Sequence, residues 1–200
     1  QPIDVSDITV GNNGFYLDFS DGANLGTLAS GTGDFTETNI DATDQATDTP
    51  TNNFATFNAL QNYYPASTFK DGNGTLETSS SSIYTPNTST FAMSTGKWYC
   101  EFETGTGAAI FVGITDKVGL WTTGTQELGD GVNEWGFYMP SGDLRNNNVS
   151  VSYGSGWSHG DVVQIALDLD NNNLYFGVDN SWENSGVPTS GATGTGAISI

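Results

Sequence analysis

Residues 159–178 read HGDVVQIALDLDNNNLYFGV, two runs of alternating apolar side chains separated by four polar residues. Successive side chains of a β-strand point to opposite faces, so every second apolar residue in each run faces a core. The separating residues 170–173 are Asp-Asn-Asn-Asn, and Asn tolerates the left-handed backbone that tight hairpin turns need. The pattern predicts an antiparallel hairpin whose core face carries Val163, Ile165, Leu167, Leu169, Leu174, Phe176 and Val178.

Three further segments read as strands. Residues 15–19 and 97–103 alternate apolar with polar side chains, whereas residues 109–114 are apolar on both faces, as is typical of a strand in the middle of a sandwich. By the same alternation we assign Trp98 and Trp135 to the core. Glycine is abundant and strong helix formers are few, so we expect almost no helix. Many short strands without helices between them predict an all-β, antiparallel β-sandwich.

The chain is strongly acidic. Its 200 residues carry 4 Lys and Arg against 23 Asp and Glu, a formal net charge of −19. Phosphate backbones and anionic lipid surfaces need Lys and Arg to replace their counterions, so this balance excludes nucleic-acid and membrane-surface binding. No run approaches the length of about 18 apolar residues that spans a bilayer, so we expect no membrane insertion.

Four motifs carry a family resemblance. They are STGKWYCEF at 94–102, FVGI at 111–114, EWGFY at 134–138 and HGDVVQIALDLDNNNLYF at 159–176. In this order and spacing they resemble the strands of SPRY domains, the core of the B30.2 module. The resemblance covers residues 53–200, and it implies a concanavalin-like jelly roll that binds protein or peptide partners through loops at one end. The family usually adds one or two strands after the position of Ile200, so we expect that the last strand is missing or is supplied by another part of an assembly.

The opening segment has a likeness of its own. NGFYLDF at 13–19 and DTPTNNFAT at 48–56 resemble the lead-in to SPRY-like domains in marine bacteriophage proteins, often tail or fibre proteins, although Ala59 stands where that pattern usually has Pro. Residues 1–52 are acidic with scattered apolar positions, and we expect an N-terminal strand and an extended arm that packs on the sandwich. Because the chain begins at Gln1, we expect a processed product or a piece of a longer protein.

Aromatic side chains in the predicted loops are the candidate binding residues. A flat ring stacks on a sugar or anchors a protein contact at low entropic cost. For Trp157, the alternative is that the ring covers one end of the core, because large aromatic side chains are mostly buried. The candidates are Trp121, Tyr63, Tyr64, Trp182 and Trp157.

The sequence contains few candidate catalytic residues. Glu101 and Glu103 share one face of a predicted strand about 6.5–7 Å apart, within the range of an acid–base pair. The hydrolases of lectin-like sandwiches use an E-x-D-x-x-E arrangement, whereas residues 101–106 read EFETGT, so we expect a solvated strand face instead. The single Cys100 alternates with core residues and the single His159 lies beside Ser158 in a turn, which disfavours a nucleophilic site at either.

A calcium site is the one cofactor that the carboxylates permit. Asp168, Asp170, Asn172 and Asp179 have the spacing of positions 1, 3, 5 and 12 of a calcium-binding loop. Position 6 is Asn173 where that loop needs Gly, and the flanks are strands, so an exposed acidic hairpin is the alternative. We expect no cofactor, with Ca²⁺ held by unspecified carboxylates as the open possibility.

These observations predict a binding or structural module and not an enzyme. The resemblance implies a virion, and hence extracellular, protein: a tail fibre, an appendage or a capsid-surface element that acts in host attachment or particle assembly. Its partners would be a host cell-surface glycan or protein, or neighbouring virion subunits, with further copies of the chain as one option. The alternatives are a glycan-cleaving enzyme that uses Glu101 and Glu103, and an architectural subunit joined to its neighbours by addition of the arm or an unpaired last strand.

Overall fold

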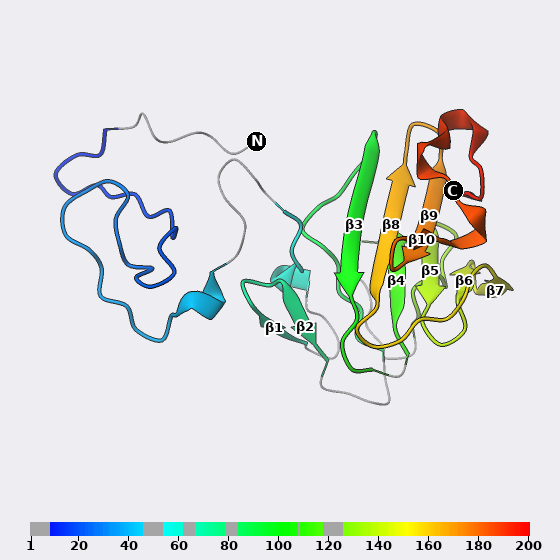
Figure 1. The fold of residues 1–200 in the computed structure, drawn as a ribbon, viewed down its shortest axis with the longest axis horizontal. Coiled ribbons are helices and arrows are strands. Elements are labelled where there is room, and N and C mark those ends of the chain that lie inside the picture. Colours follow the sequence, from blue (N-terminus) through cyan, green and yellow to red (C-terminus); the bar gives the residue numbers. More distant parts are fainter. Residues whose placement is uncertain (1–8, 46–53, 62–66, 79–83, 108, 118–125) are drawn as a thin grey trace. The chain divides into compact units, whose positions relative to one another are not determined.

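The computed structural model describes residues 9–45, 54–61, 67–78, 84–107, 109–117 and 126–200. Within these ranges the secondary structure consists of strands and short 3₁₀ helices, and every strand pair is antiparallel (Figure 1). The chain divides into two compact units, Gln1–Phe91 and Ala92–Ile200. This division falls later than the boundary at residue 52 that the sequence predicts.

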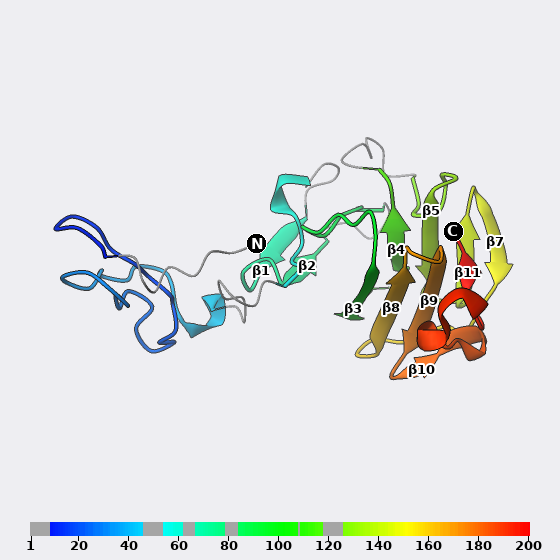
Figure 2. The same cartoon turned by 90° about the horizontal axis from the view of Figure 1, so that it is seen from above.

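The second unit is a sandwich of two sheets (Figure 2). One sheet has the order β10-β9-β8-β3, and the last strand, β11, also pairs with β9. The predicted hairpin is confirmed as β8 and β9, with Leu167 opposite Leu174. The strands of this sheet are β3 (Lys97–Glu103), β8 (Val162–Asp168), β9 (Asn173–Val178), β10 (Ser181–Trp182) and β11 (Ile198–Ser199).

The other sheet has the order β4-β5-β6-β7. Its strands are β4 (Phe111–Thr115), β5 (Glu134–Tyr138), β6 (Asp143–Asn146) and β7 (Val149–Ser152). The prediction that residues 109–114 form a central strand is wrong, because β4 is the outermost described strand of its sheet. Its apolar character on both faces follows instead from Val112 in the core and from Phe111, whose ring stacks on Tyr138 at 4.4 Å on the outer face.

The core lies between the facing sides of the two sheets. Phe137 is fully buried at its centre, with the ring of Phe176 5.0 Å away and the ring of Trp157 4.4 Å away. The inward-facing side chains of β8 and β9 therefore pack directly against inward-facing side chains of the other sheet. The buried members of the cluster are Val112, Phe137, Met139, Leu144, Trp157, Val163, Ile165, Leu167, Leu174, Phe176 and Ile198.

Asparagines make the tight turns. The β6–β7 hairpin turns at Asn147 and Asn148, whose φ angles are 49° and 60°. The β9–β10 hairpin turns at Asp179 and Asn180, at 48° and 64°. Two consecutive residues with positive φ form the turn whose twist matches that of the flanking strands, and Asn and Asp are the non-glycine residues that accept it most readily.

Trp98 corrects a sequence prediction. Its side chain is 42% exposed, and its indole Nε1 donates to the carbonyl of Thr95. Trp98 lies at the start of β3, the outermost described strand of its sheet, whereas Cys100 and Phe102 further along pack against the core. Trp135 is partly buried and packs against the core, as predicted.

The first unit contains less regular structure. It includes the hairpin of β1 (Thr68–Lys70) and β2 (Thr75–Glu77) and the 3₁₀ helices η1 (Ala42–Asp44) and η2 (Ala59–Gln61). The predicted strand at residues 15–19 is reduced to a single bridge between Tyr16 and Ser30. Phe15 and Phe19 stay about half exposed, since none of the described strands extends the bridge. The packing of residues 1–52 on the sandwich stays a prediction.

None of the helices in the described part of the chain has the length and hydrophobicity that crossing a bilayer requires.

Phe137→Ala tests the core. The substitution leaves a cavity among Phe176, Trp157 and Tyr153, so we expect a loss of about 3–5 kcal/mol in the free energy of unfolding. Urea unfolding followed by tryptophan fluorescence measures it. Val149→Ala, at a side chain that is 58% exposed on β7, is the control and should change the free energy by less than about 0.5 kcal/mol. Equal losses in the two variants would contradict the assignment of the core.

Candidate functional site

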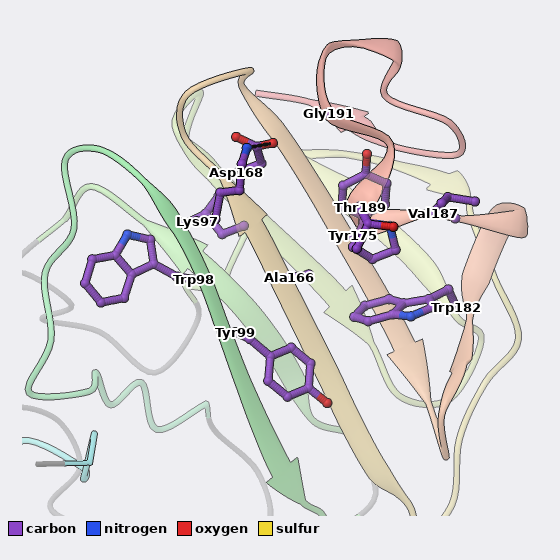
Figure 3. A pocket seen from close by; sticks show the side chains of 13 residues that line it. Lys97, Trp98, Tyr99, Ala166, Asp168, Tyr175, Trp182, Val187, Thr189 and Gly191 are labelled. Carbon is purple, nitrogen blue, oxygen red and sulfur yellow. Dashed lines mark hydrogen bonds and ion pairs between the residues drawn. The ribbon is translucent and has the colours of Figure 1, made fainter. Parts of the chain in front are cut away.

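A groove of about 690 Å³ lies on the outer face of the β3-β8-β9-β10 sheet (Figure 3). One side is formed by β3, and the other by the segment after β10, which contains η3 (Glu183–Ser185) and η4 (Pro188–Thr193). Its volume is in the range of about 300–1,000 Å³ that is typical of small-ligand sites. The lining residues are Lys97, Trp98, Tyr99, Ala166, Leu167, Asp168, Tyr175, Trp182, Gly186, Val187, Pro188, Thr189 and Gly191.

Strand register explains the shape of the groove. Tyr99 on β3 is opposite Ala166 on β8, and Ala166 is opposite Tyr175 on β9. These three side chains point away from the core, because their neighbours along each strand point into it. Alanine is the smallest of the three, so the floor is low at Ala166, and the larger side chains rise around it (Figure 3). Tyr175 is 1% exposed beneath the segment that follows β10, where its hydroxyl lies 3.3 Å from Ser190 Oγ.

Trp182 forms the aromatic wall at the β10 side. It is opposite Gly177 on β9, and a Cβ built at Gly177 would lie 3.1 Å from Trp182 Cε3. The missing side chain therefore lets the indole ring lie close against β9. The ring meets Tyr99 and Tyr175 edge-on, at centroid distances of 6.3 and 6.5 Å and interplanar angles of 66° and 75°. Such edge-to-face contacts are favourable and restrict the ring to one orientation.

Tyr99 forms the opposite wall and is held by its hydroxyl. Gln164 Nε2 donates to Tyr99 Oη at 2.8 Å, and Tyr99 Oη donates to Glu101 Oε1 at 2.5 Å. Gln164 is 4% exposed, and its Oε1 accepts the backbone N–H of Asn180 at 2.8 Å. The pKa of Tyr99 is raised, first by burial of its hydroxyl and then by the hydrogen bond to Glu101. The ring itself is 54% exposed, so the network fixes a side chain whose face stays accessible.

Lys97 and Asp168 form an ion pair at one end of the groove. Asp168 also accepts the backbone N–H groups of Asp170 and Asn171 and the side-chain amide of Asn171, so it closes the β8–β9 turn. The hydrogen bonds from Lys97 and then Asn171 hold the pKa of Asp168 below its usual value. Its carboxylate is thus saturated by contacts within the protein.

The calcium-loop hypothesis fails on this geometry. Asp168 is engaged by Lys97 at one end of the β8–β9 hairpin, whereas Asp179 accepts the backbone N–H of Val162 at the other end. Side chains at opposite ends of a hairpin cannot ligate one ion. Among the described residues, no group of three or more His, Cys, Asp or Glu side chains is arranged to hold a metal ion.

The cations of the chain are all used internally. The sequence has four Lys and Arg residues, and the structure describes each of them in an ion pair. Lys117 pairs with the fully buried Glu134, whose other oxygen accepts the N–H groups of Gly129 and Gly131. The pairs are Lys70–Glu77, Lys97–Asp168, Lys117–Glu134, Arg145–Glu127 and Arg145–Asp130.

The predicted binding residues have different outcomes. Trp182 is partly exposed and lines the groove. Trp157 is 5% exposed with its ring against Phe137, which confirms its interpretation as a core residue and leaves it no face for a ligand. Trp121, Tyr63 and Tyr64 lie outside the described residues.

Sequence reasoning missed Tyr99 as a site residue. The sequence does contain a signal for Tyr99, because the alternation of β3 places this aromatic side chain on the outer face of the sheet. What the sequence does not contain is the opposing wall, since the position of Trp182 depends on the β9–β10 turn and on the close approach at Gly177.

None of the candidate catalytic residues lines the groove. Glu101 and Glu103 are both exposed on the outer face of β3, and neither lines the groove. Nδ1 of His159 lies 2.6 Å from the carbonyl oxygen of Gly105, which turns the imidazole to the backbone. Cys100 points toward the core, and burial, followed by the charge of Glu101, raises the pKa of its thiol to about 11.

Comparison with models of known families gives no match, and a search of curated proteins finds no significant relative.

The reactivity of Cys100 tests whether its side chain points toward the core. With a pKa near 11 and a partly buried side chain, the thiol should react slowly with Ellman's reagent at about pH 8, where a free cysteine is substantially ionised. Absorbance at completion should report one thiol after unfolding in urea. Rapid, stoichiometric labelling of the native chain would contradict the inward orientation of Cys100.

Proposed function

We propose that this chain is a non-catalytic binding module of a bacteriophage virion protein, and that it attaches the particle to the host cell surface through the outer-face groove. The four motifs that resemble SPRY domains and the phage-like lead-in support the setting. The groove supports the mode of action. The observation that carries the proposal is the pair formed by Tyr99 and Trp182, two partly accessible aromatic side chains that line one groove and hold each other in edge-to-face contact.

Fixed aromatic rings make effective binding residues because little conformational freedom is lost when a ligand arrives. The Gln164 and Glu101 hydrogen bonds hold Tyr99, and the close approach at Gly177 holds Trp182. Among the described residues, the candidate catalytic groups form no comparable arrangement, since Glu101 is hydrogen-bonded to Tyr99, Cys100 packs against the core and His159 contacts the backbone of Gly105. These features support adhesion over glycan cleavage.

The Trp182→Ala and Tyr99→Ala variants test the proposal. Fluorescently labelled chain is incubated with a panel of marine bacterial strains, and bound fluorescence is measured by flow cytometry. On the strain that the wild-type chain binds, each variant should weaken binding by about tenfold or more, because aromatic side chains at the centre of a site carry most of the binding energy.

Tyr138→Ala is the matched control. It removes a tyrosine whose ring stacks on Phe111 on the outer face of the other sheet, and Tyr138 does not line the groove, so binding should be unchanged. Circular dichroism and urea unfolding should show that all three variants are folded. Attachment that survives Trp182→Ala and Tyr99→Ala, or that is lost equally in Tyr138→Ala, would exclude the groove as the contact surface.

A second candidate is an architectural role through strand addition. The edge strand β7 reads Val-Ser-Val-Ser, all four of its residues are exposed, and it carries no charge or proline to block pairing. Natural proteins usually protect such edges, because they pair with other chains. β7 is therefore the described edge that best fits contact between neighbouring subunits.

This candidate makes its own prediction. A chain that adds strands at β7 should form dimers or larger species in light scattering coupled to gel filtration, and Val151→Lys should convert them to monomers because a lysine blocks edge pairing. Trp98→Ala should leave the oligomeric state unchanged. A monomeric wild-type chain at high concentration would exclude strand addition by this edge.

A further inference from the structure

We propose that the ligand of the groove is an uncharged glycan, a chain of neutral pyranose rings, and that acidic or sulfated polysaccharides are rejected. This inference rests on the proposed function, in that the groove is the binding site. It adds the chemical class of the ligand, which follows from the charge, the aromatic faces and the hydrogen-bond donors of the groove.

The charge of the groove selects against ionic ligands. The lining contains one cation and one anion, Lys97 and Asp168, and these neutralise each other. The remaining three cations of the chain are paired elsewhere, while the chain as a whole has a formal charge of −19. A uronate or sulfate group would be repelled by the protein and would find no unpaired cation. A basic peptide would find no unpaired carboxylate in the lining.

The aromatic rings select for a ligand with a flat, weakly polar face. The π face of an aromatic ring carries partial negative charge and attracts partially positive C–H groups. One side of a pyranose ring presents several C–H groups together, whereas its hydroxyls project around the edge. Tyr99 and Trp182 flank Ala166 (Figure 3) and their rings meet edge-to-face at a centroid distance of 6.3 Å, so a sugar ring stacks on the exposed surface of this aromatic pair and does not enter between the two rings.

The polar groups of the groove are placed for the edge of such a ring. Trp182 Nε1 has no hydrogen-bond partner among the described residues, and an indole N–H can only donate. The Lys97 side chain is 57% exposed beyond its contact with Asp168, and its ammonium has further N–H groups to donate. Thr189 adds an exposed hydroxyl. These groups suit the hydroxyl oxygens of a neutral sugar, which accept hydrogen bonds without carrying charge.

The location of the groove disfavours an extended peptide. Peptides that join a sheet do so at an edge, through the backbone groups of the outer strand. This groove lies on the face of the sheet, over β8, whose backbone is paired on both sides with β3 and β9. The recognition elements are side chains, as the binding of a sugar requires.

Native affinity electrophoresis of the full chain tests the ligand class. The acidic chain migrates readily, and a polysaccharide cast in the gel retards it only if the two bind. Neutral galactan, β-glucan and mannan are compared with carrageenan, a sulfated galactan, and alginate, a polyuronate. We expect retardation by at least one neutral polysaccharide, weakening by about tenfold or more in Trp182→Ala and Tyr99→Ala. Trp182→Phe, which keeps a ring but loses the N–H, should weaken retardation less, and Tyr138→Ala, outside the groove, should not weaken it.

A second arm uses the cells to which the labelled chain binds. Periodate cleaves the vicinal diols of sugars, and protease digestion removes surface proteins. We expect periodate to abolish Trp182-dependent binding and protease to leave it intact. The reverse result, or retardation that is as strong with carrageenan and alginate as with the neutral polymers, would overturn the neutral-glycan inference. The inference would also be overturned if none of the neutral polymers retarded the chain.

The two arms separate the inference from the proposed function. A chain that binds cells through Trp182 in a protease-sensitive and periodate-resistant manner keeps the attachment function and loses the glycan ligand. A chain that neutral polysaccharide retards, but that binds no strain of the panel, keeps the glycan ligand and loses the attachment function.

Discussion

The two-residue period of β8 is the constraint on which both the core and the groove depend. Val163, Ile165 and Leu167 point into the sandwich, whereas Gln164, Ala166 and Asp168 point to the outer face. All six are less than 9% exposed, so neither face of this strand is simply solvated. A shift of register by one residue would exchange the two sets and would place polar groups in the core. The core therefore fixes the floor of the groove.

A second constraint is electrostatic. In a chain with 23 acidic residues, each of the four Lys and Arg side chains is bound to at least one carboxylate. Arg145 on β6 holds the segment before β5 through Glu127 and Asp130, and Lys117, just after β4, pairs with Glu134 on β5. The positive charge of these four side chains is thus neutralised by ion pairs within the protein. The groove is consequently a locally neutral region in an acidic protein, and this contrast connects the fold to the kind of ligand that can approach it.

The sequence alone predicted the parts of the structure that depend on local pattern. The hairpin of residues 162–178 follows from alternation and from the run of Asn residues, and the burial of Trp135 follows from the same alternation. Trp98 follows the same alternation, yet its side chain is exposed because it lies near the end of an edge strand. The pattern within a single strand does not reveal where the core ends. The aromatic groove was found only in part, since the meeting of Tyr99 and Trp182 requires strands β3 and β10, which are distant in sequence, to lie in one sheet.

Fluorine NMR of the chain labelled with 5-fluorotryptophan tests the central claim most directly. The chain has five tryptophans, so five resonances are expected, each assigned by a Trp→Phe substitution. On titration with a neutral oligosaccharide from a polymer that retards the chain, the account predicts a shift of the Trp182 resonance, with those of Trp135 and Trp157, which do not line the groove, unchanged. A titration that shifts another tryptophan while Trp182 stays in place would contradict it.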